Sequence, residues 1–540
     1  MDTQGYTPDW PDNFKERYRR EGYWTDETFA SLIDVAAERF AQRTAIIDGE
    51  QRVSFRQLQE QSLCAASGLV RIGLQAGDRV VVQMPNCYEF IVISAALFRV
   101  GVVPVYALPG HRQRDLEHLI TLTEAKAYIG VARYKGQDNQ KMLNDLRGAC
   151  PSLEQCIFKN AFDEAIGLQM LFIAPQDSYP IVRADDVALM QISGGTTGLP
   201  KLITRCHREY LYSIRRSCEC CEFDAQTVYL AVLPLAHNFT MSSPGFWGVL
   251  REGGTVVVTP SPLPSDAFEL IDKHQINCVA LVPPLVRLWV DALEPGDRRL
   301  ASLRLVQVGG AKLPPSVAKM LCERIPGHLQ QVFGMAEGLV CYSALGEQPD
   351  QAAEAWVRPM SEEDEILIVD DDGLPVAVGE TGHLLTRGPY TIRGYFNAAE
   401  QNESSFDGQG FYRTGDLVRQ SQDGRLQVMG RDKEQINKGA EKVSPEEVEE
   451  ALIATGLVSD AVVVAQEDEY LGERIIGVVI LHPNSDLTLL KRTLLQRMAS
   501  YKVPDAFVTV EHFPTTAVGK LSRRQLRLQV RQLIEQGAPC

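Results

Sequence analysis

The sequence of 540 residues lacks any apolar run near the ~20 residues that a membrane-spanning helix needs. Its N-terminal segment is polar and mixed in charge, without the apolar core of a secretory signal peptide. Positive charge is also scarce, because 54 lysines and arginines stand against 70 aspartates and glutamates, for a net charge of −16. Nucleic-acid binders usually carry a basic face, so this balance disfavours that class. We therefore expect a cytoplasmic globular protein.

No cysteine pattern typical of a zinc site occurs among the 12 cysteines. Cys218, Cys220 and Cys221 cluster, but a second cysteine pair and a nearby set of histidines are missing. The surrounding residues predict a helix over 208–223 with Cys218 and Cys221 on its apolar face. We expect these cysteines to be small core residues, and a cytoplasmic location keeps all cysteines reduced.

The length predicts at least two domains, and the first shows a regular alternation of predicted strands and helices. Short β-branched runs alternate with helical runs, which is typical of a mostly parallel sheet covered by helices on both faces. Two N-terminal helices, 29–39 and 55–71, flank a strand at 44–47. The predicted strands are 79–84, 102–105, 255–259, 278–282 and 303–308, and the helices that follow them are 88–99, 268–274, 285–293 and 315–324.

The texture changes at Glu365, where short strands and turns predict a small β subdomain over about 365–430. A boundary is expected near residue 431, giving an α/β N-terminal domain over 1–431 and a smaller α+β C-terminal domain over 432–540. The C-terminal segment carries a βαβ texture of its own. Its predicted helices are 445–455 and 487–498, and its predicted strands are 461–465 and 475–481.

Residues 193–201, with the sequence SGGTTGLPK, are the most informative stretch. Glycines let backbone N–H groups approach an anion, the hydroxyl side chains add donors, and Lys201 adds positive charge. These properties predict a phosphate-binding loop. It is not a Walker A loop, because Pro200 stands where that motif needs glycine. The alternative is an ordinary Gly/Thr-rich surface turn.

Further motifs follow this loop in order. They are QVFGMAEG at 331–338, YRTGD at 412–416, GRDK at 430–433 and PTTAVGK at 514–520. With them, the chain resembles the adenylate-forming enzymes, which include acyl-CoA ligases, luciferases and the adenylation domains of nonribosomal peptide synthetases. Near the N-terminus, Trp10-Pro11 and residues 21–24 (EGYW) resemble the stand-alone aryl-acid ligases of siderophore pathways, above all those specific for 2,3-dihydroxybenzoate.

The resemblance implies a reaction in two halves. A carboxylate attacks the α-phosphorus of ATP, giving an acyl-adenylate and pyrophosphate, and a thiol then displaces AMP. The implied substrates and cofactors are an aryl acid, ATP and Mg²⁺. The implied acceptor is a phosphopantetheinylated aryl carrier protein supplied in trans, since the chain has no carrier segment. Alternatives are a salicylate–AMP ligase, an aryl-CoA ligase and a non-catalytic binding homologue, which has no need of a catalytic lysine.

The resemblance also implies the nucleotide site. Lys201, Lys520 and His237 are the implied catalytic residues. Glu337 is the implied Mg²⁺ ligand, and Asp416 the acceptor for both ribose hydroxyls, assisted by Arg431. The full implied ATP/AMP set is Ser193, Gly194, Gly195, Thr196, Thr197, Gly198, Gly309, Gly310, Ala311, Val332, Phe333, Gly334, Met335, Glu337, Asp416 and Arg431. Plainer roles stay open: a helix-start carboxylate for Glu337 and turns for the Gly-Asp and Gly-Gly pairs.

Substrate choice is expected to depend on residues 234–244. Amino-acid-activating relatives carry aspartate at the Asn238 position, so a neutral amide there predicts a substrate without an α-amino group. Ser243 falls where dihydroxybenzoate ligases carry serine and salicylate ligases tend to carry cysteine. The expected aryl-acid set is Asn238, Phe239, Ser243, Gly309, Val332 and Val340. For the valines, ordinary core packing is an equal alternative.

The resemblance implies a mobile C-terminal domain with a hinge at Lys433. Its implied thiolation face is Gly439, Ala440 and Lys442. Ala440 departs from the family's glycine, beside which the thiol arm of the acceptor passes close to the backbone. Two other departures are Phe239, where many relatives have tyrosine, and Trp356-Val357, where relatives have Gln-Gly.

Overall fold

The computed structural model describes residues 7–193, 200–431, 436–439, 441–483, 485–511, 513, 526 and 530–531. These residues divide into two compact units. The first takes in most of the chain up to Gly430, and the second takes in Gly110–His118, Pro200, Lys201 and the described residues from Arg431 onward. No helix of the described chain is long and apolar enough to cross a membrane.

The largest sheet of the first unit is mainly parallel. Its strands, in spatial order, are β18 (Arg358–Pro359), β17 (Val340–Tyr342), β16 (His328–Gly334), β15 (Leu305–Gly309), β14 (Cys278–Leu281), β12 (Val228–Ala231), β13 (Thr255–Val258), β1 (Thr44–Asp48) and β2 (Gln51–Ser54). Helices α10 (Pro264–His274), α11 (Pro283–Ala292) and α12 (Pro315–Arg324) follow β13, β14 and β15. The prediction of an α/β fold with parallel-rich sheets is confirmed.

A second sheet of the first unit repeats this plan with parallel pairs around β3. Its order is β11 (Lys201–Cys206), β10 (Val187–Ser193), β4 (Val103–Tyr106), β3 (Arg79–Gln83), β5 (Ala127–Val131), β8 (Gln155–Lys159) and β9 (Ile166–Gly167). A short pair, β6 (Arg133–Tyr134) and β7 (Gln137–Asp138), stands apart from it.

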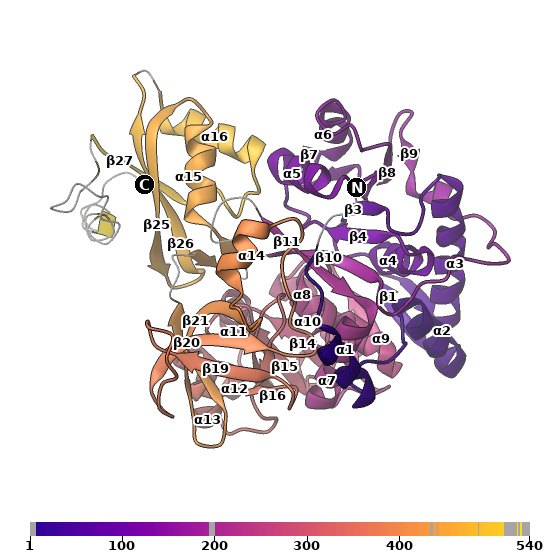
Figure 1. Ribbon diagram of the computed structural model, residues 1–540, viewed down its shortest axis with the longest axis horizontal. Helices are drawn as coiled ribbons and strands as arrows, with labels where there is room; N and C mark the ends of the chain where they lie inside the picture. Colours follow the sequence, from indigo (N-terminus) through magenta and orange to yellow (C-terminus); the bar gives the residue numbers. More distant parts are fainter. Residues whose placement is uncertain are drawn as a thin grey trace. The chain divides into compact units, whose positions relative to one another are not determined.

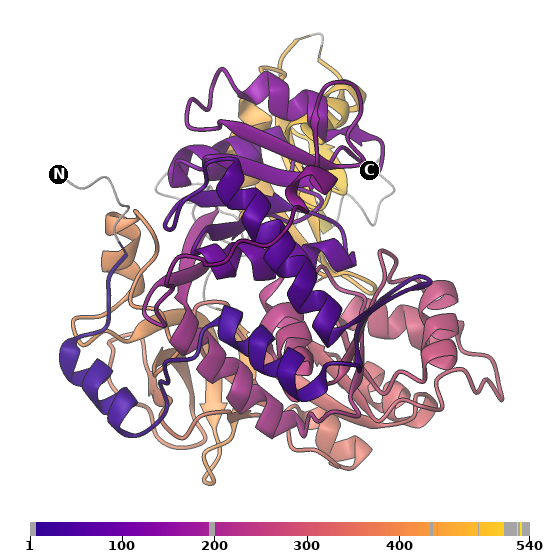
Figure 2. The same ribbon diagram turned by 90° about the vertical axis from the view of Figure 1, so that its right-hand side faces the viewer.

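The predicted N-terminal helices are present as α2 (Phe29–Phe40), α3 (Phe55–Arg71) and α4 (Tyr88–Val100). Capping boxes at Thr28 and Ser54 satisfy the first backbone N–H groups of α2 and α3. The three helices pack against one another, and α2 and α3 lie side by side in both Figure 1 and Figure 2. Helix α4 is apolar over nearly its whole surface because neighbours surround it.

Other helices complete the first unit. They are α1 (Asp12–Arg20), α6 (Asn139–Leu146), η1 (Leu168–Leu171), α7 (His207–Cys221), α8 (Asn238–Ser242), α9 (Gly245–Glu252), α13 (Pro349–Glu354) and α14 (Ala399–Ser405), while α5 (Gln113–Thr123) runs through both units. On α7, Cys218 and Cys221 are buried, as predicted. The described cysteines are all free, and no group of three or more potential metal ligands occurs in this part of the chain.

The small β subdomain is an antiparallel sheet in the order β19 (Glu365–Val369), β20 (Thr381–Arg387), β21 (Tyr412–Gln420) and β22 (Leu426–Arg431). Its inner face contributes Leu384, Val418 and Leu426 to one apolar cluster with Met335 and Leu339 from the loop after β16. This cluster joins the subdomain to the carboxyl edge of the large sheet.

The second unit contains a sheet in the order β24 (Glu441–Val443), β23 (Ile436–Lys438), β26 (Gly472–Leu481) and β25 (Val458–Asp468), with β27 (Ala506–Thr509) also beside β26. Its helices are α15 (Pro445–Ile453) and α16 (Leu487–Arg497). The predicted βαβ texture is present as β26–α16–β27, because β26 and β27 are parallel. Strands β25 and β26 instead form an antiparallel hairpin, closed near Gly472, whose φ is 78°.

A buried charge cluster lies within the second unit. Lys502 Nζ is 2.7 Å from a carboxylate oxygen of Asp115 and 2.7 Å from one of Glu447. Burial disfavours the charged amine, but the two carboxylates outweigh this effect and raise the pKa of Lys502. The cluster accounts for the grouping of Gly110–His118 with the C-terminal residues.

Candidate active site

Helix α8 and strands β15 and β16 bring most of the predicted aryl-acid residues to one edge of the large sheet. Strands β12, β15 and β16 belong to its parallel part, so the loops that follow them leave from the same edge. Ligands of open α/β sheets bind at this carboxyl edge. His237 caps α8, since its Nδ1 accepts a hydrogen bond from the backbone N–H of Phe239 at 3.2 Å.

Phe239 and Val332 both lie close to Gly309. A Cβ placed on Gly309 would lie 2.9 Å from the carbonyl oxygen of Val332 and 3.2 Å from two ring carbons of Phe239. Only a glycine therefore lets the Phe239 ring approach the end of β15 this closely. Strand β16 also pairs with β17 in antiparallel register, and Val340 on β17 is the partner of Gly334 on β16.

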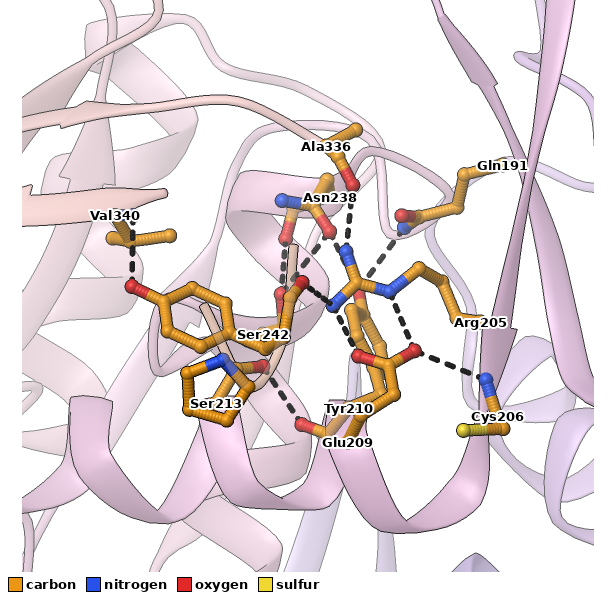
Figure 3. A network of polar contacts seen from close by, with 12 residues as sticks. Gln191, Arg205, Cys206, Glu209, Tyr210, Ser213, Asn238, Ser242, Ala336 and Val340 are labelled. Carbon is orange, nitrogen blue, oxygen red and sulfur yellow. Dashed lines mark hydrogen bonds and ion pairs between the residues drawn. The ribbon is translucent and has the colours of Figure 1, made fainter. Parts of the chain in front are cut away.

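The side-chain carbonyl oxygen of Asn238 accepts hydrogen bonds from two hydroxyl groups. Its Oδ1 accepts hydrogen bonds from the Tyr210 hydroxyl at 2.7 Å and from the Ser242 hydroxyl at 3.2 Å (Figure 3). Its Nδ2 makes no hydrogen bond with any described residue. An amide carries two acceptor lone pairs on oxygen and two N–H donors, so the donors remain available for a ligand.

Ser243 lies one helical turn after Phe239, and its N–H donates to the Phe239 carbonyl at 3.3 Å. The residue is only 3% exposed. Within the described chain its hydroxyl has no hydrogen-bond partner. Ser243 is therefore a buried polar residue directly after α8, and an unpaired buried hydroxyl is costly unless a ligand satisfies it.

Glu337 follows β16 and is the centre of a hydroxyl cluster. One of its carboxylate oxygens accepts hydrogen bonds from Ser193 at 2.5 Å and from Tyr395 at 2.9 Å. Tyr395 in turn bonds the hydroxyl of Tyr412 on β21 at 3.0 Å. The side-chain oxygen atoms of Ser193 and Glu337 are the kind of metal ligand that Mg²⁺ prefers.

Asp416 lies four residues after Tyr412 on β21, within an irregularity in the pairing with β20 that also contains Gly415, whose φ is 73°. Asp416 is buried, and its N–H donates to Thr414 Oγ1 at 3.0 Å. Arg431 is the last residue of β22. Phe333 and Gly334 end β16, whereas Met335 follows it in the apolar cluster.

The rest of the predicted set falls partly outside the described residues. Residues Gly194, Gly195, Thr196, Thr197, Gly198, Lys433, Ala440 and Lys520 lie there. Lys201 begins β11, and Gly310 follows β15 with a φ of 84°. In the second unit, Gly439 makes the turn between β23 and β24 with a φ of 68°, and Lys442 pairs with Asn437 across this hairpin.

A buried ion pair behind Asn238 carries no sequence signal. Arg205 donates two hydrogen bonds to Glu209, at 2.9 and 2.5 Å, and both side chains are almost fully buried. The other bonds of Arg205 reach the carbonyls of Ala336 at 2.7 Å and Tyr390 at 3.0 Å. Burial disfavours the guanidinium charge, but Glu209 outweighs it and raises the pKa of Arg205. Glu209 follows Arg205 by only four residues, but Ala336 and Tyr390 are 131 and 185 positions away from Arg205, so no local motif predicts the whole network.

Tyr390 connects the β subdomain to the same site. Its hydroxyl donates to a carboxyl oxygen of Asp364 at 2.6 Å and accepts from the N–H of Val340 at 3.3 Å. Trp356, which replaces the family's glutamine, contacts other residues. The guanidinium groups of Arg419 and Arg425 lie over its ring, 5.3 and 5.8 Å from the ring centre.

Comparison with known protein families covers most of the chain. Residues 33–396 match the family described as AMP-binding enzyme, and residues 447–520 match its C-terminal domain.

Individual relatives align over nearly the full length. The 2,3-dihydroxybenzoate-AMP ligase of Bacillus subtilis (strain 168) is 46% identical over 526 residues, 97% of each chain. A salicylyl-CoA synthase / salicylate adenylyltransferase of Streptomyces sp. is 40% identical, over 98% of each chain. Among solved structures, apo MbtA of Mycobacterium smegmatis superposes with a TM-score of 0.75 at 40% identity, covering 97% of this chain and 99% of the other.

Proposed function

The chain belongs to the AMP-binding enzyme family, and from this premise we propose that it is an aryl acid–AMP ligase acting on 2,3-dihydroxybenzoate. It joins the acid to the α-phosphate of ATP and releases pyrophosphate. It then transfers the aryl group to the phosphopantetheine thiol of a carrier protein in siderophore biosynthesis. Full-length similarity to a ligase of this specificity supports the proposal.

The observation that carries the substrate assignment is the side-chain amide of Asn238, whose oxygen is held by the hydroxyl groups of Tyr210 and Ser242. The group is neutral and offers donors, so it suits a ring hydroxyl and gives no counter-charge to an α-ammonium. The Ser243 hydroxyl supplies a second polar contact. Together they favour a flat acid with two neighbouring ring hydroxyls.

Nucleotide binding is assigned to the Glu337 cluster, Asp416 and the loop that ends at Lys201. The Glu337 carboxylate and the Ser193 hydroxyl suit a magnesium ion, which when bound would neutralise charge on the phosphates. Asp416 offers two acceptor oxygens for the ribose diol. Lys520, from the C-terminal domain, stabilises the charge that develops between the carboxylate and the α-phosphate.

An aryl-CoA ligase is the second candidate for the acceptor step. It is supported by the similarity to the salicylyl-CoA synthase / salicylate adenylyltransferase. Ala440, where the family resemblance implies glycine, bears on transfer to either thiol, because it adds a methyl group beside which the thiol arm would pass.

The test is ATP–pyrophosphate exchange with a panel of substituted benzoates and α-amino acids. We expect 2,3-dihydroxybenzoate to have the highest kcat/KM, followed by salicylate and then benzoate. A panel led by unsubstituted benzoate or by an amino acid contradicts the assignment. Comparing the purified carrier protein with free coenzyme A as acceptor then separates the two candidate second steps.

A further inference from the structure

The Tyr210 hydroxyl has its hydrogen bonds fixed by its neighbours. Tyr210 lies on α7 and is 1% exposed. Its oxygen accepts a hydrogen bond from the side-chain amide N–H of Gln191, on β10, at 3.1 Å. A phenol has one proton to give, and here it goes to Asn238 Oδ1 at 2.7 Å. Burial raises the pKa of Tyr210 to about 12, so the proton stays on at neutral pH.

This bond decides which end of the Asn238 amide faces a ligand. The oxygen and nitrogen of an amide group are nearly the same size, so a half-turn about the last side-chain torsion exchanges them. Tyr210 donates to Oδ1, and Ser242 shares its hydroxyl proton between Oδ1 at 3.2 Å and the Asn238 backbone carbonyl at 3.1 Å, so a half-turn would point the amide nitrogen at these donors. The observed orientation therefore leaves the nitrogen as the outward group, a donor without a partner in the described chain (Figure 3).

Tyr210 is itself held by the buried Arg205–Glu209 pair. The Arg205 guanidinium lies 4.7 Å from the centre of the Tyr210 ring, a cation–π distance. The same guanidinium is bonded to Glu209, Ala336 and Tyr390. Because Ala336 precedes Glu337 in the chain, one rigid network supports both the Asn238 amide and the start of the Glu337 turn.

We propose that Tyr210 is a positioning residue for substrate selection, whose hydroxyl fixes the Asn238 amide so that its NH₂ group donates to an ortho oxygen on the aryl acid. The proposal rests on the proposed aryl-acid activation. It assigns the selectivity for an ortho acceptor to a residue that touches Asn238 rather than the substrate.

The test is Tyr210→Phe, which removes one hydroxyl and keeps the ring. Pyrophosphate exchange is measured with salicylate, benzoate and anthranilate, whose ortho group is a hydroxyl, a hydrogen and an amine. In the variant the amide is free to turn and present its carbonyl, so the kcat/KM ratio of salicylate to anthranilate should fall about tenfold or more. The KM for ATP should stay within about twofold, because no proposed nucleotide contact changes.

Tyr212→Phe is the matched control. Tyr212 is also buried on α7, and its hydroxyl bonds Ser361 at 2.6 Å rather than Asn238. It should keep the wild-type ratio. Ser242→Ala removes the other donor to Asn238 Oδ1 and should shift the salicylate-to-anthranilate ratio in the same direction as Tyr210→Phe. If Tyr210→Phe does not fold, Ser242→Ala still tests the proposal.

A double variant checks that the effect passes through Asn238. Adding Tyr210→Phe to Asn238→Ala should leave the ratio of the single Asn238→Ala variant unchanged. Wild-type ratios in folded Tyr210→Phe or Ser242→Ala, or additive effects in the double variant, would overturn the proposal. If the wild-type enzyme activates neither these acids nor 2,3-dihydroxybenzoate, the proposed function itself fails.

Discussion

At the scale of single residues, the proposed aryl-acid site depends on polar atoms that the described chain leaves without an internal partner. Asn238 Nδ2 and the Ser243 hydroxyl are two of them, one on α8 and one directly after it. Leaving such a group unpaired in a buried place costs about 1–3 kcal/mol, which is the scale of one to two decades in specificity. Selection among substituted benzoates therefore needs only two well-placed side chains.

Ser243→Cys should narrow or reverse the preference for 2,3-dihydroxybenzoate over salicylate. A thiol is a much weaker hydrogen-bond partner than a hydroxyl, so the second ring hydroxyl loses its contact. We expect the ratio of kcat/KM values for the two acids to fall by roughly one to two decades while the KM for ATP hardly moves. Exchange assays with both acids measure this ratio, and an unchanged ratio would mean that Ser243 does not line the site.

Asp364 should make the stability of the protein depend on pH. Burial raises the pKa of its carboxyl to about 8, far above the ordinary value of about 3.9. The folded protein therefore binds this proton between those values while the unfolded chain has released it. Stability should fall as pH rises through this range, by up to about 1.4 kcal/mol per pH unit from this group.

Asp364→Asn tests this effect, because the amide imitates the neutral acid and still accepts the Tyr390 hydrogen bond. Its free energy of unfolding should lack this downward slope when denaturant titrations are run between pH 4 and 8. Asp12→Asn, at a side chain 92% exposed, is the control and should keep the wild-type slope. Parallel curves for wild type and Asp364→Asn would show that Asp364 is ionised in the folded protein.

Residues inside motifs could be proposed from the sequence, and the residues that contact them from other parts of the chain could not. Asn238 and Glu337 were predicted from short patterns with family resemblance. Tyr395, Tyr210 and the Arg205–Glu209 pair were not, because each acts through a contact with a residue distant in sequence, 58 positions away for Tyr395 and Glu337. No spacing rule reports such a contact before the fold is known.

At the scale of elements, the aryl-acid site depends on how closely α8 approaches the ends of β15 and β16. Gly309→Ala should disturb this approach, because its Cβ would lie 2.9 Å from a backbone oxygen and 3.2 Å from the Phe239 ring. We expect kcat/KM for the aryl acid to fall about tenfold to hundredfold, since small displacements near a reacting group are costly. Exchange assays on the folded variant measure this loss.

Two further variants make the Gly309 test specific. Gly148→Ala is the control, since a Cβ there meets nothing within 4 Å, and it should behave as wild type. Adding Phe239→Leu to Gly309→Ala relieves the ring contact and should restore part of the activity. Wild-type activity in Gly309→Ala alone would show that the close approach does not matter for the acid.

Elements with strong periodicity could be predicted, whereas others, among them β5, β10, β12, β16 and α9, were not. Helices α3 and α12 have the predicted bounds, and the other expected helices and strands differ by a few residues at their ends. Strand β27 was missed: it is only four residues long and follows a turn, so its run is too short to show a period. The β25–β26 hairpin was not predicted either, because alternating apolar residues do not reveal which strand pairs with which.

At the scale of the whole molecule, the proposed reaction needs two arrangements of the same chain. Adenylation requires Lys520 near the carboxylate and α-phosphate, whereas thiol transfer requires the Gly439–Lys442 hairpin near the acyl-adenylate. The family resemblance implies that the C-terminal domain rotates between the half-reactions about Lys433. The sequence suggests this only through family resemblance, since a hinge has no periodicity of its own.

The two half-reactions should therefore separate by mutation. Lys433→Pro fixes φ near −65° and removes a backbone donor at the proposed hinge, where a large backbone change is needed. It should retain pyrophosphate exchange but lose carrier loading. Lys520→Ala should do the opposite: exchange falls by about 10²–10³, while transfer from a preformed aryl-adenylate persists. The measurements are exchange and loading by each purified, folded variant. Parallel loss of both activities in both variants would argue against rotation, because a hinge and a catalytic lysine that act at separate steps cannot fail in the same way.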